Sequence, residues 1–94
     1  MTKVEHKNSG SKGQFTLMED GKQIGMMTYS MAGNEKMIID HTEVDPAFKG
    51  KGMGEKLVIA GAEYARKENL KILPLCPFAK NIFSKNKEIQ DVRV

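Results

Sequence analysis

Polar and apolar residues alternate along the first half of the chain, which is the pattern of strands with one buried face. Residues 14–19 show it most clearly, because Phe15 and Leu17 fall on one face and polar residues fall on the other. Asp20-Gly21 follows directly and is a typical two-residue hairpin turn. We therefore predict a strand over residues 14–19 and a chain reversal immediately after it.

The next segments continue this pattern. Residues 22–31 predict the returning strand, in which the apolar positions change phase near Gly25, and such a change indicates either a β-bulge or burial on both faces. Gly33-Asn34 predicts a second turn, and residues 35–44 predict a third strand. Residues 4–7 are candidates for a short edge strand, separated from the first hairpin by a loop rich in glycine and serine. Together these segments predict an antiparallel meander.

The apolar period changes to that of a helix over residues 53–69. The residues on its apolar face are Met53, Leu57, Ala60, Gly61 and Tyr64. A short strand is expected over residues 71–75, and Pro77 is expected to begin a second helix that ends near residue 86. This order predicts an α+β fold, in which the last strand lies parallel to the strand over residues 35–44 after a right-handed crossover.

Composition places the chain among soluble single domains. At 94 residues, with 39% hydrophobic and 29% charged residues, it is long enough for one core, so we expect residues 1–94 to form one domain. No apolar stretch approaches the roughly 18 residues of a membrane span, and the first residues carry no apolar secretory signal. We therefore expect a cytoplasmic protein without a membrane partner.

Cysteine and charge content narrow the possible partners. Cys76 is the only cysteine, so the chain can form neither an internal disulfide nor a two-cysteine metal site, and we expect no bound metal. The net charge is +3, and of the 15 basic residues only Arg66 and Arg93 are arginines. Proteins that read nucleic acids rely more heavily on arginine, which makes a nucleic-acid partner the weaker expectation. The phosphates of a small cofactor would suit the same charge.

Three glycines stand at alternate positions between the third strand and the first helix, in the run Lys49-Gly50-Lys51-Gly52-Met53-Gly54. Glycine allows an anionic ligand to approach the backbone N–H groups closely, and the helix behind adds unpaired N–H donors and a positive dipole end. The spacing does not fit the P-loop, and the third glycine of the dinucleotide fingerprint would fall on Glu55. The run therefore predicts a diphosphate-binding loop of another kind.

The loop resembles the acyl-CoA signature of the GNAT superfamily of N-acetyltransferases, which is Gln/Arg-x-x-Gly-x-Gly/Ala. Here the signature is Lys49-x-x-Gly52-x-Gly54, and lysine in the first position keeps the positive charge. Residues 41–46, Leu57 and Cys76-Pro77 extend the resemblance to the small single-domain GNAT-like proteins. The resemblance implies a GNAT-like fold, with an antiparallel strand meander, a glycine loop, a helix, a parallel strand and a C-terminal helix.

The same resemblance implies acetyl-CoA as the cofactor and an amine, on a small molecule or a protein, as the acetyl acceptor. In this family the strand before the loop lends backbone groups to the pantetheine arm, and the loop amides hold the pyrophosphate. These roles fall on Thr42, Glu43 and Val44 for the arm and on Lys49, Gly50, Lys51, Gly52, Met53 and Gly54 for the pyrophosphate. Lys80 and Asn81, near the start of the last helix, are further candidates for contact with the coenzyme.

Cys76 is the first candidate catalytic residue. Pro77 at the first helical position would make Cys76 the N-cap, where the helix dipole and free N–H groups favour the thiolate. The resemblance places this residue near the acyl thioester. Cys76 could therefore accept the acetyl group or pair with the coenzyme thiol as a disulfide, and the alternative is a small buried core residue.

His41 is the second candidate. It alternates with Met37 and Ile39, so we expect its ring on the buried side, either as a general base or as a structural histidine. Many GNAT enzymes reprotonate the coenzyme thiolate with a tyrosine of the final helix, and Phe83 stands at that position here. The chain also lacks the segments that shape the acceptor pocket in larger members, so a bulky acceptor would bind openly.

Three functions remain open from the sequence. The first is acetyl transfer from acetyl-CoA to an amine, with Cys76 as a candidate relay. The second is acyl-CoA binding without catalysis, or covalent acyl carriage on Cys76. The third is a basic nucleic-acid-binding module that would use Lys49, Lys51, Lys56, Lys80 and Lys85. The third is disfavoured because two tyrosines and four phenylalanines, mostly at core-facing positions, offer few platforms for base stacking.

Overall fold

The computed structural model describes residues 2–94. Its elements are β1 (Thr2–Ser9), β2 (Lys12–Glu19), β3 (Lys22–Ala32), β4 (Lys36–Val44), the 3-10 helix η1 (Pro46–Phe48), α1 (Met53–Lys67), β5 (Lys71–Pro74), α2 (Pro77–Lys85) and the 3-10 helix η2 (Lys87–Val92). The five strands form one sheet in the order β1-β2-β3-β4-β5. Neighbours among β1 to β4 are antiparallel, and β5 is parallel to β4, which confirms the expected α+β arrangement.

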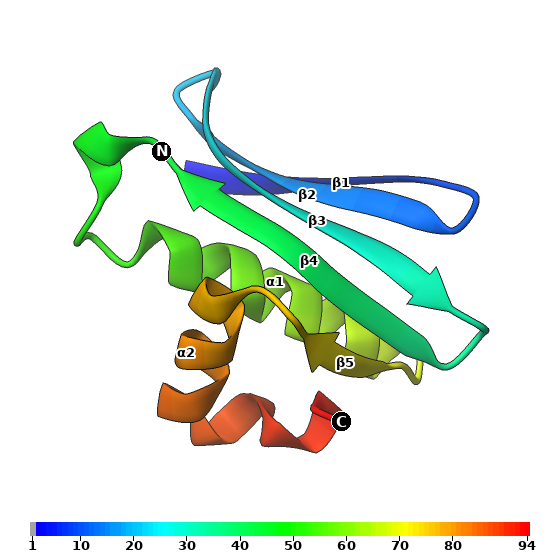
Figure 1. Ribbon diagram of the computed structural model, residues 1–94. Helices are drawn as coiled ribbons and strands as arrows, with labels where there is room; N and C mark the ends of the chain where they lie inside the picture. Colours follow the sequence, from blue (N-terminus) through cyan, green and yellow to red (C-terminus); the bar gives the residue numbers. More distant parts are fainter. Residues whose placement is uncertain (1) are drawn as a thin grey trace.

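The helices gather on one side of the sheet. Figure 1 shows α1 running beneath the strands with α2 and η2 beside it, while no helix of the described chain covers the opposite face. Along β1, Lys3, Glu5 and Lys7 point to this uncovered face and are exposed, whereas Val4 and His6 point toward α1 and are half-buried. None of the described helices is long and apolar enough to cross a membrane.

The core fills the space between the sheet and the helices. Its fully buried side chains include Leu17, Met27, Met37, Ile39, Leu57, Val58, Ile72 and Phe83. An aromatic cluster extends this core toward β1. The His6 ring is stacked on Phe15 with ring centroids 4.1 Å apart, and its Nε2 lies 2.5 Å from the Tyr29 hydroxyl. Tyr64 of α1 meets the edge of the same stack. This cluster fixes the end of α1 that is remote from the glycine loop.

The hairpin formed by β1 and β2 has a shorter turn than expected. β1 and β2 pair along their whole length, from Thr2 opposite Glu19 to Ser9 opposite Lys12, so most of the predicted loop is strand. Only Gly10 and the residue after it form the turn, and Gly10 has a φ of +63°, a left-handed conformation that favours glycine. In the next hairpin the register of β2 against β3 shifts just after Leu17, which confirms the predicted bulge near Gly25.

A second bulge corrects the expectation for His41. Thr28 pairs with His41 but Tyr29 pairs with Ile39, so Asp40 is an extra residue in β4. The extra residue reverses the alternation, and Thr42 rather than His41 is buried next along the strand after Ile39. The expectation that the His41 ring lies on the buried side was therefore wrong. The ring is exposed, and its Nε2 lies 3.4 Å from the Glu43 carboxylate.

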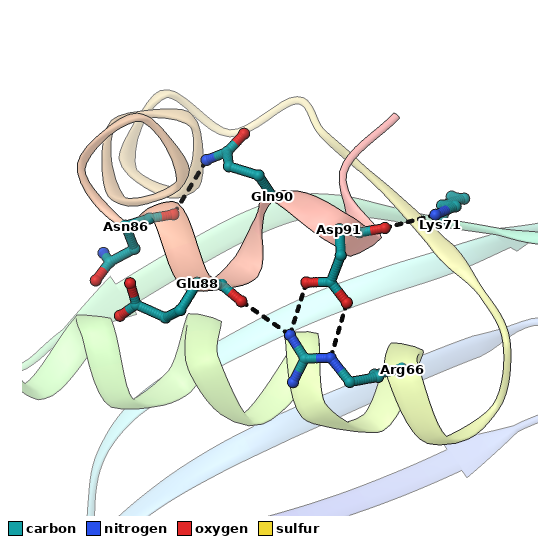
Figure 2. A network of polar contacts seen from close by, with 6 residues as sticks. All are labelled: Arg66, Lys71, Asn86, Glu88, Gln90 and Asp91. Atoms are coloured by element: carbon teal, nitrogen blue, oxygen red, sulfur yellow. Dashed lines mark hydrogen bonds and ion pairs between the residues drawn. The ribbon is translucent and has the colours of Figure 1, made fainter.

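The C-terminal segment is fastened to α1 and β5. In Figure 2 the Arg66 guanidinium donates two hydrogen bonds to the Asp91 carboxylate, at 2.8 and 2.7 Å, and a third to the Glu88 carbonyl at 3.0 Å. The Lys71 ammonium donates to the Asp91 carbonyl. Beyond these contacts, the Val94 N–H donates a hydrogen bond of 2.8 Å to the Ile72 carbonyl. A segment without apolar periodicity is thus held by a bidentate ion pair and backbone hydrogen bonds.

Candidate functional site

A groove of about 730 Å³ opens between the end of β4, the glycine loop and the first turns of α2. This volume suits a cofactor-sized ligand. The residues that line it are Thr42, Glu43, Val44, Pro46, Phe48, Lys49, Gly50, Gly52, Met53, Gly54, Glu55, Phe78, Asn81, Ile82 and Lys85. The groove therefore joins the continuous segment from the end of β4 to the start of α1 with α2, which is far from it in the sequence and adjacent in space.

The glycine loop begins at a rigid turn. The Asp45 carboxylate accepts a hydrogen bond of 2.9 Å from the Ala47 N–H and so caps the short helix η1. Gly50 and Gly52 then have φ values of +80° and +73°, and no atom lies within 4 Å of the place where either Cβ would stand. Both positions therefore require glycine for their backbone conformation, and both leave their backbone open to a ligand.

The start of α1 is left without a side-chain cap. Its N-cap is Gly52, which has no side chain to accept from the first turn. The first N–H groups of a helix have no partner within the helix, and together with the dipole they form an anion-binding end. Lys49 and Lys85 line the groove and add positive charge, and Glu43 and Glu55 line it as well. This geometry suits a phosphate or diphosphate.

Gly54 differs from the other two glycines. It lies within α1 and does not have a positive φ. A Cβ at this position would stand only 2.1 Å from Cζ of Phe78, so the space above Gly54 is filled by an aromatic ring. Gly54 lines the groove, and a packing contact explains why it is glycine.

Cys76 stands where β4 and β5 separate. It is the N-cap of α2, as predicted, and is 8% exposed. Its N–H and that of Leu75 both donate to the Ile39 carbonyl, at 3.3 and 3.0 Å. β4 continues beyond this point to Val44, whereas β5 ends at Pro74. The sulfur therefore lies at the point where the two parallel strands diverge, just behind the first turn of α2.

The surroundings of Cys76 favour its ionised form. Burial raises the pKa of the thiol, but the neighbouring Ala79 and Phe78 N–H groups and Thr42 outweigh this effect, so the pKa lies below its ordinary value. Thr42 is 8% exposed, and its hydroxyl has no hydrogen-bond partner in the described chain. A buried hydroxyl in this position is available to a thiolate or to a ligand atom.

The structure brings most of the predicted site residues together. Those that line the groove are Thr42, Glu43, Val44, Lys49, Gly50, Gly52, Met53, Gly54 and Asn81. Lys51 and Lys80, which are exposed, and Cys76, which is buried, lie outside the groove lining. The Lys51 ammonium sits 5.7 Å from the centre of the Phe48 ring. His41 is on the uncovered face with Glu43, away from the buried side where it was expected. Phe83 is fully buried in the core and carries no proton to donate.

Sequence reasoning missed several groove residues. They are Pro46, Phe48, Glu55, Phe78, Ile82 and Lys85. One signal was available for those on α2, because Phe78, Ile82 and Lys85 have helical spacing and share a face with Asn81. The position of that face against the glycine loop depends on how α2 docks, and this docking has no local signature.

The chain matches known proteins over most of its length. A family model described as GCN5-related N-acetyl-transferase matches residues 14–92. The curated protein NATD1 of Xenopus tropicalis is 27% identical over 85 residues, which is 89% of this chain and 76% of that protein.

Solved structures extend the similarity. A GCN5-like putative N-acetyltransferase from Staphylococcus aureus is 36% identical, with a TM-score of 0.74, and the match covers 100% of this chain and 91% of that one. A GNAT family acetyltransferase from Elizabethkingia anophelis, solved with acetyl-CoA bound, shares the fold with a TM-score of 0.67 at 14% identity over 76% of this chain. The chain spans 62% of the length of that enzyme.

Proposed function

This chain belongs to the GCN5-related N-acetyltransferase family, and on that premise we propose that it binds acetyl-CoA in the groove and passes the acetyl group to an amine through Cys76. One observation carries the proposal. The uncapped start of α1 and the two open glycines, Gly50 and Gly52, lie in the same groove as Thr42, whose proximity helps to lower the pKa of Cys76. A diphosphate and a thioester on one flexible ligand suit these two ends.

Different groups of residues would contact different parts of the ligand. The N–H groups of the loop and of the first turn of α1 would hold the diphosphate, with Lys49 and Lys85 balancing its charge. The end of β4, over Thr42, Glu43 and Val44, would lie along the pantetheine arm. Lys51, Lys80 and Asn81 remain proposed contacts to the outer part of the coenzyme. The thioester would then lie near the divergence of β4 and β5.

Cys76 would act as the acetyl relay. On ionisation its proton goes to solvent, and the thiolate attacks the acetyl carbonyl carbon. The carbon–sulfur bond to the coenzyme breaks, and the coenzyme leaves as its thiolate. The acceptor amine then attacks the acetyl-cysteine, which restores the Cys76 thiolate and releases one proton to solvent or to a base. The Phe78 and Ala79 N–H groups and the Thr42 hydroxyl stabilise the sulfur in its charged form.

His41 is the proposed base on the acceptor side. Its exposed ring lies beside Glu43 and away from the buried Ile39 and Thr42 of the same strand, on a face where a bulky amine could approach. Phe83 cannot serve as a general acid, so the coenzyme thiolate would be protonated from solvent. A large substrate such as a protein amine is consistent with this open face.

The relay is tested by mass spectrometry after incubation with acetyl-CoA. We expect the wild-type protein to gain one acetyl group that hydroxylamine removes, because a thioester is labile to it. Cys76→Ser should gain none while still binding acetyl-CoA in a calorimetric titration. An adduct that persists in Cys76→Ser would assign the acetyl group to another residue and refute the relay.

A second candidate function is covalent acyl carriage without transfer to an amine. The absence of a protonable side chain at Phe83 favours it, because the usual acid is missing. Adding a lysine-containing peptide to the acetylated protein separates the two functions. Loss of the acetyl group from Cys76 with acetylation of the peptide supports transfer, whereas a stable acetyl-cysteine supports carriage.

A further inference from the structure

We propose that Phe78 is a specificity-determining contact for the acyl-pantetheine arm of the cofactor, and that Gly54 is glycine because the ring of Phe78 is seated on it. The proposal rests on the proposed function and deepens it. The acyl-pantetheine arm is the part of the ligand that carries no phosphate. The proposal assigns its recognition to Phe78, which lies outside the glycine-loop motif.

Phe78 is an exposed aromatic ring at the wall of the groove. It is 41% exposed, and in the described chain only Leu75 and Val94 are large apolar side chains with comparable exposure. Water contact with an apolar ring is unfavourable, so a phenylalanine held in a groove indicates an apolar ligand surface. Val44, Phe48, Met53 and Ile82 line the same groove and extend the apolar wall.

The Phe78 ring packs against α1 in the space left by the absence of a side chain at Gly54. Cζ and Cε1 of Phe78 lie 2.1 and 2.4 Å from the place where a Cβ of Gly54 would stand. The helical backbone of Gly54 does not itself require glycine, and alanine is the better helix former. The acyl-CoA signature accepts Gly or Ala at this position, but here the methyl group of an Ala would have to displace the Phe78 ring.

Phe78 also touches both ends of the proposed ligand path. Its side chain faces the groove close to the start of α1, where the diphosphate would be held. Its backbone belongs to the first turn of α2, two residues after the N-cap Cys76, where the acetyl group would be delivered. A chain that joins a diphosphate to a thioester must therefore pass along this ring, and its methylene groups can pack on the ring face.

Calorimetric titration with two ligands isolates the contribution of the ring. Acetyl-CoA carries the arm, whereas ADP carries only the diphosphate end. We expect Phe78→Ala to weaken acetyl-CoA binding on the order of tenfold, which corresponds to one well-packed apolar contact. Binding of ADP should change by less than about twofold, because its contacts end at the loop. Leu75→Ala, an exposed apolar neighbour outside the groove, is the matched control and should bind both ligands normally.

The seat on Gly54 is tested by a double-mutant cycle. Gly54→Ala should weaken acetyl-CoA binding because the added methyl group pushes the ring into the groove. The double variant Gly54→Ala with Phe78→Ala should bind no more weakly than Phe78→Ala alone, so the two effects are not additive. Thermal unfolding of each variant confirms that it is folded. Phe78→Leu keeps an apolar side chain without the ring, so its affinity for acetyl-CoA should lie between those of the wild type and Phe78→Ala.

The possible outcomes separate this proposal from the function on which it rests. Failure of the wild-type protein to bind acetyl-CoA would refute the proposed function itself. Normal acetyl-CoA binding by the wild type, with equal or tighter binding by Phe78→Ala, would refute the role of the ring. Equal losses of ADP and acetyl-CoA binding in Phe78→Ala, or additive losses in the cycle, would also overturn the proposal.

Discussion

Two glycines in this protein lie directly beneath aromatic rings, and the two pairs serve different ends of the molecule. A Cβ on Gly13 of β2 would stand 2.2 Å from the Tyr29 ring, and a Cβ on Gly54 of α1 would stand 2.1 Å from the Phe78 ring. The contacts are equally close. The surroundings of the rings are not.

Tyr29 is 2% exposed, whereas Phe78 is 41% exposed. The Tyr29 hydroxyl is hydrogen-bonded to His6, and its ring is packed among Phe15 and Tyr64. A ring held on every side has no room to yield, but a ring with one side in a groove can move into the groove. The glycine beneath Tyr29 therefore serves stability, whereas we infer that the glycine beneath Phe78 serves ligand recognition.

The largest expected effect comes from Gly13→Ala. The methyl group must displace a buried, hydrogen-bonded ring, and such overpacking costs about 1–3 kcal/mol in the free energy of unfolding. Urea unfolding measures this loss. Gly54→Ala is the matched control, because the exposed ring can yield and alanine is the better helix former, so its stability should change by less than about 1 kcal/mol. Equal destabilisation by both substitutions would remove the distinction between the two seats.

Arg66→Gln tests the end of α1 remote from the groove. Its loss removes the bidentate contact with Asp91 and the bond to Glu88, so we expect a lower Tm with unchanged affinity for acetyl-CoA. Arg66 lowers the pKa of Asp91, so the contribution is present above the unfolded carboxyl pKa and is lost as the pH falls through the lower folded value. A Tm difference that persists unchanged in strong acid would contradict this origin.

His6 should make the stability of the buried cluster depend on pH. Burial lowers the pKa of His6 in the folded protein below the unfolded value of 6.5. The unfolded chain therefore binds the proton more readily, and stability falls as the pH drops from about 6.5 toward the folded pKa, then levels off. Urea midpoints between pH 7.5 and 5 follow this decline. His6→Gln should flatten it.

The smallest expected effect is that of Thr42→Val on Cys76. Valine has the shape of threonine without the hydroxyl, so the fold should be kept and one hydrogen bond to the thiolate lost. The pKa of Cys76 should then rise toward its ordinary value. The rate of alkylation by iodoacetamide as a function of pH measures this shift, with Cys76→Ser as the unreactive control. An unchanged midpoint would show that the Thr42 hydroxyl does not reach the sulfur.

The sequence predicted the order of elements because alternation, helical periodicity and turn residues are local signals. It missed the length of the first hairpin, where Asn8, Ser9 and Gly13 have the composition of a loop. These residues are strand because they pair across the sheet, and Gly13 supplies space for Tyr29. Cross-strand pairing of this kind leaves no trace in a short window.

Only part of the candidate site could be predicted from the sequence. The strand, loop and helix that present Gly50 and Gly52 are contiguous, so the motif and its context could be identified together. The orientation of His41 could not, because a bulge at Asp40 is set by the partner strand. Phe78 was missed for a related reason. Its exposure and its contact with Gly54 exist only after α2 has docked beside the start of α1.

The sequential strand order has a consequence for how the chain folds. Each antiparallel pair joins strands that are neighbours in the sequence, so β1 to β4 can form from short loops at little entropic cost. The β4–β5 pair must wait for α1 to cross the sheet, and both walls of the groove belong to the segments that this crossover brings together. We expect native-state hydrogen exchange to show β5 and α2 opening before the meander, so that partial unfolding disassembles the groove first.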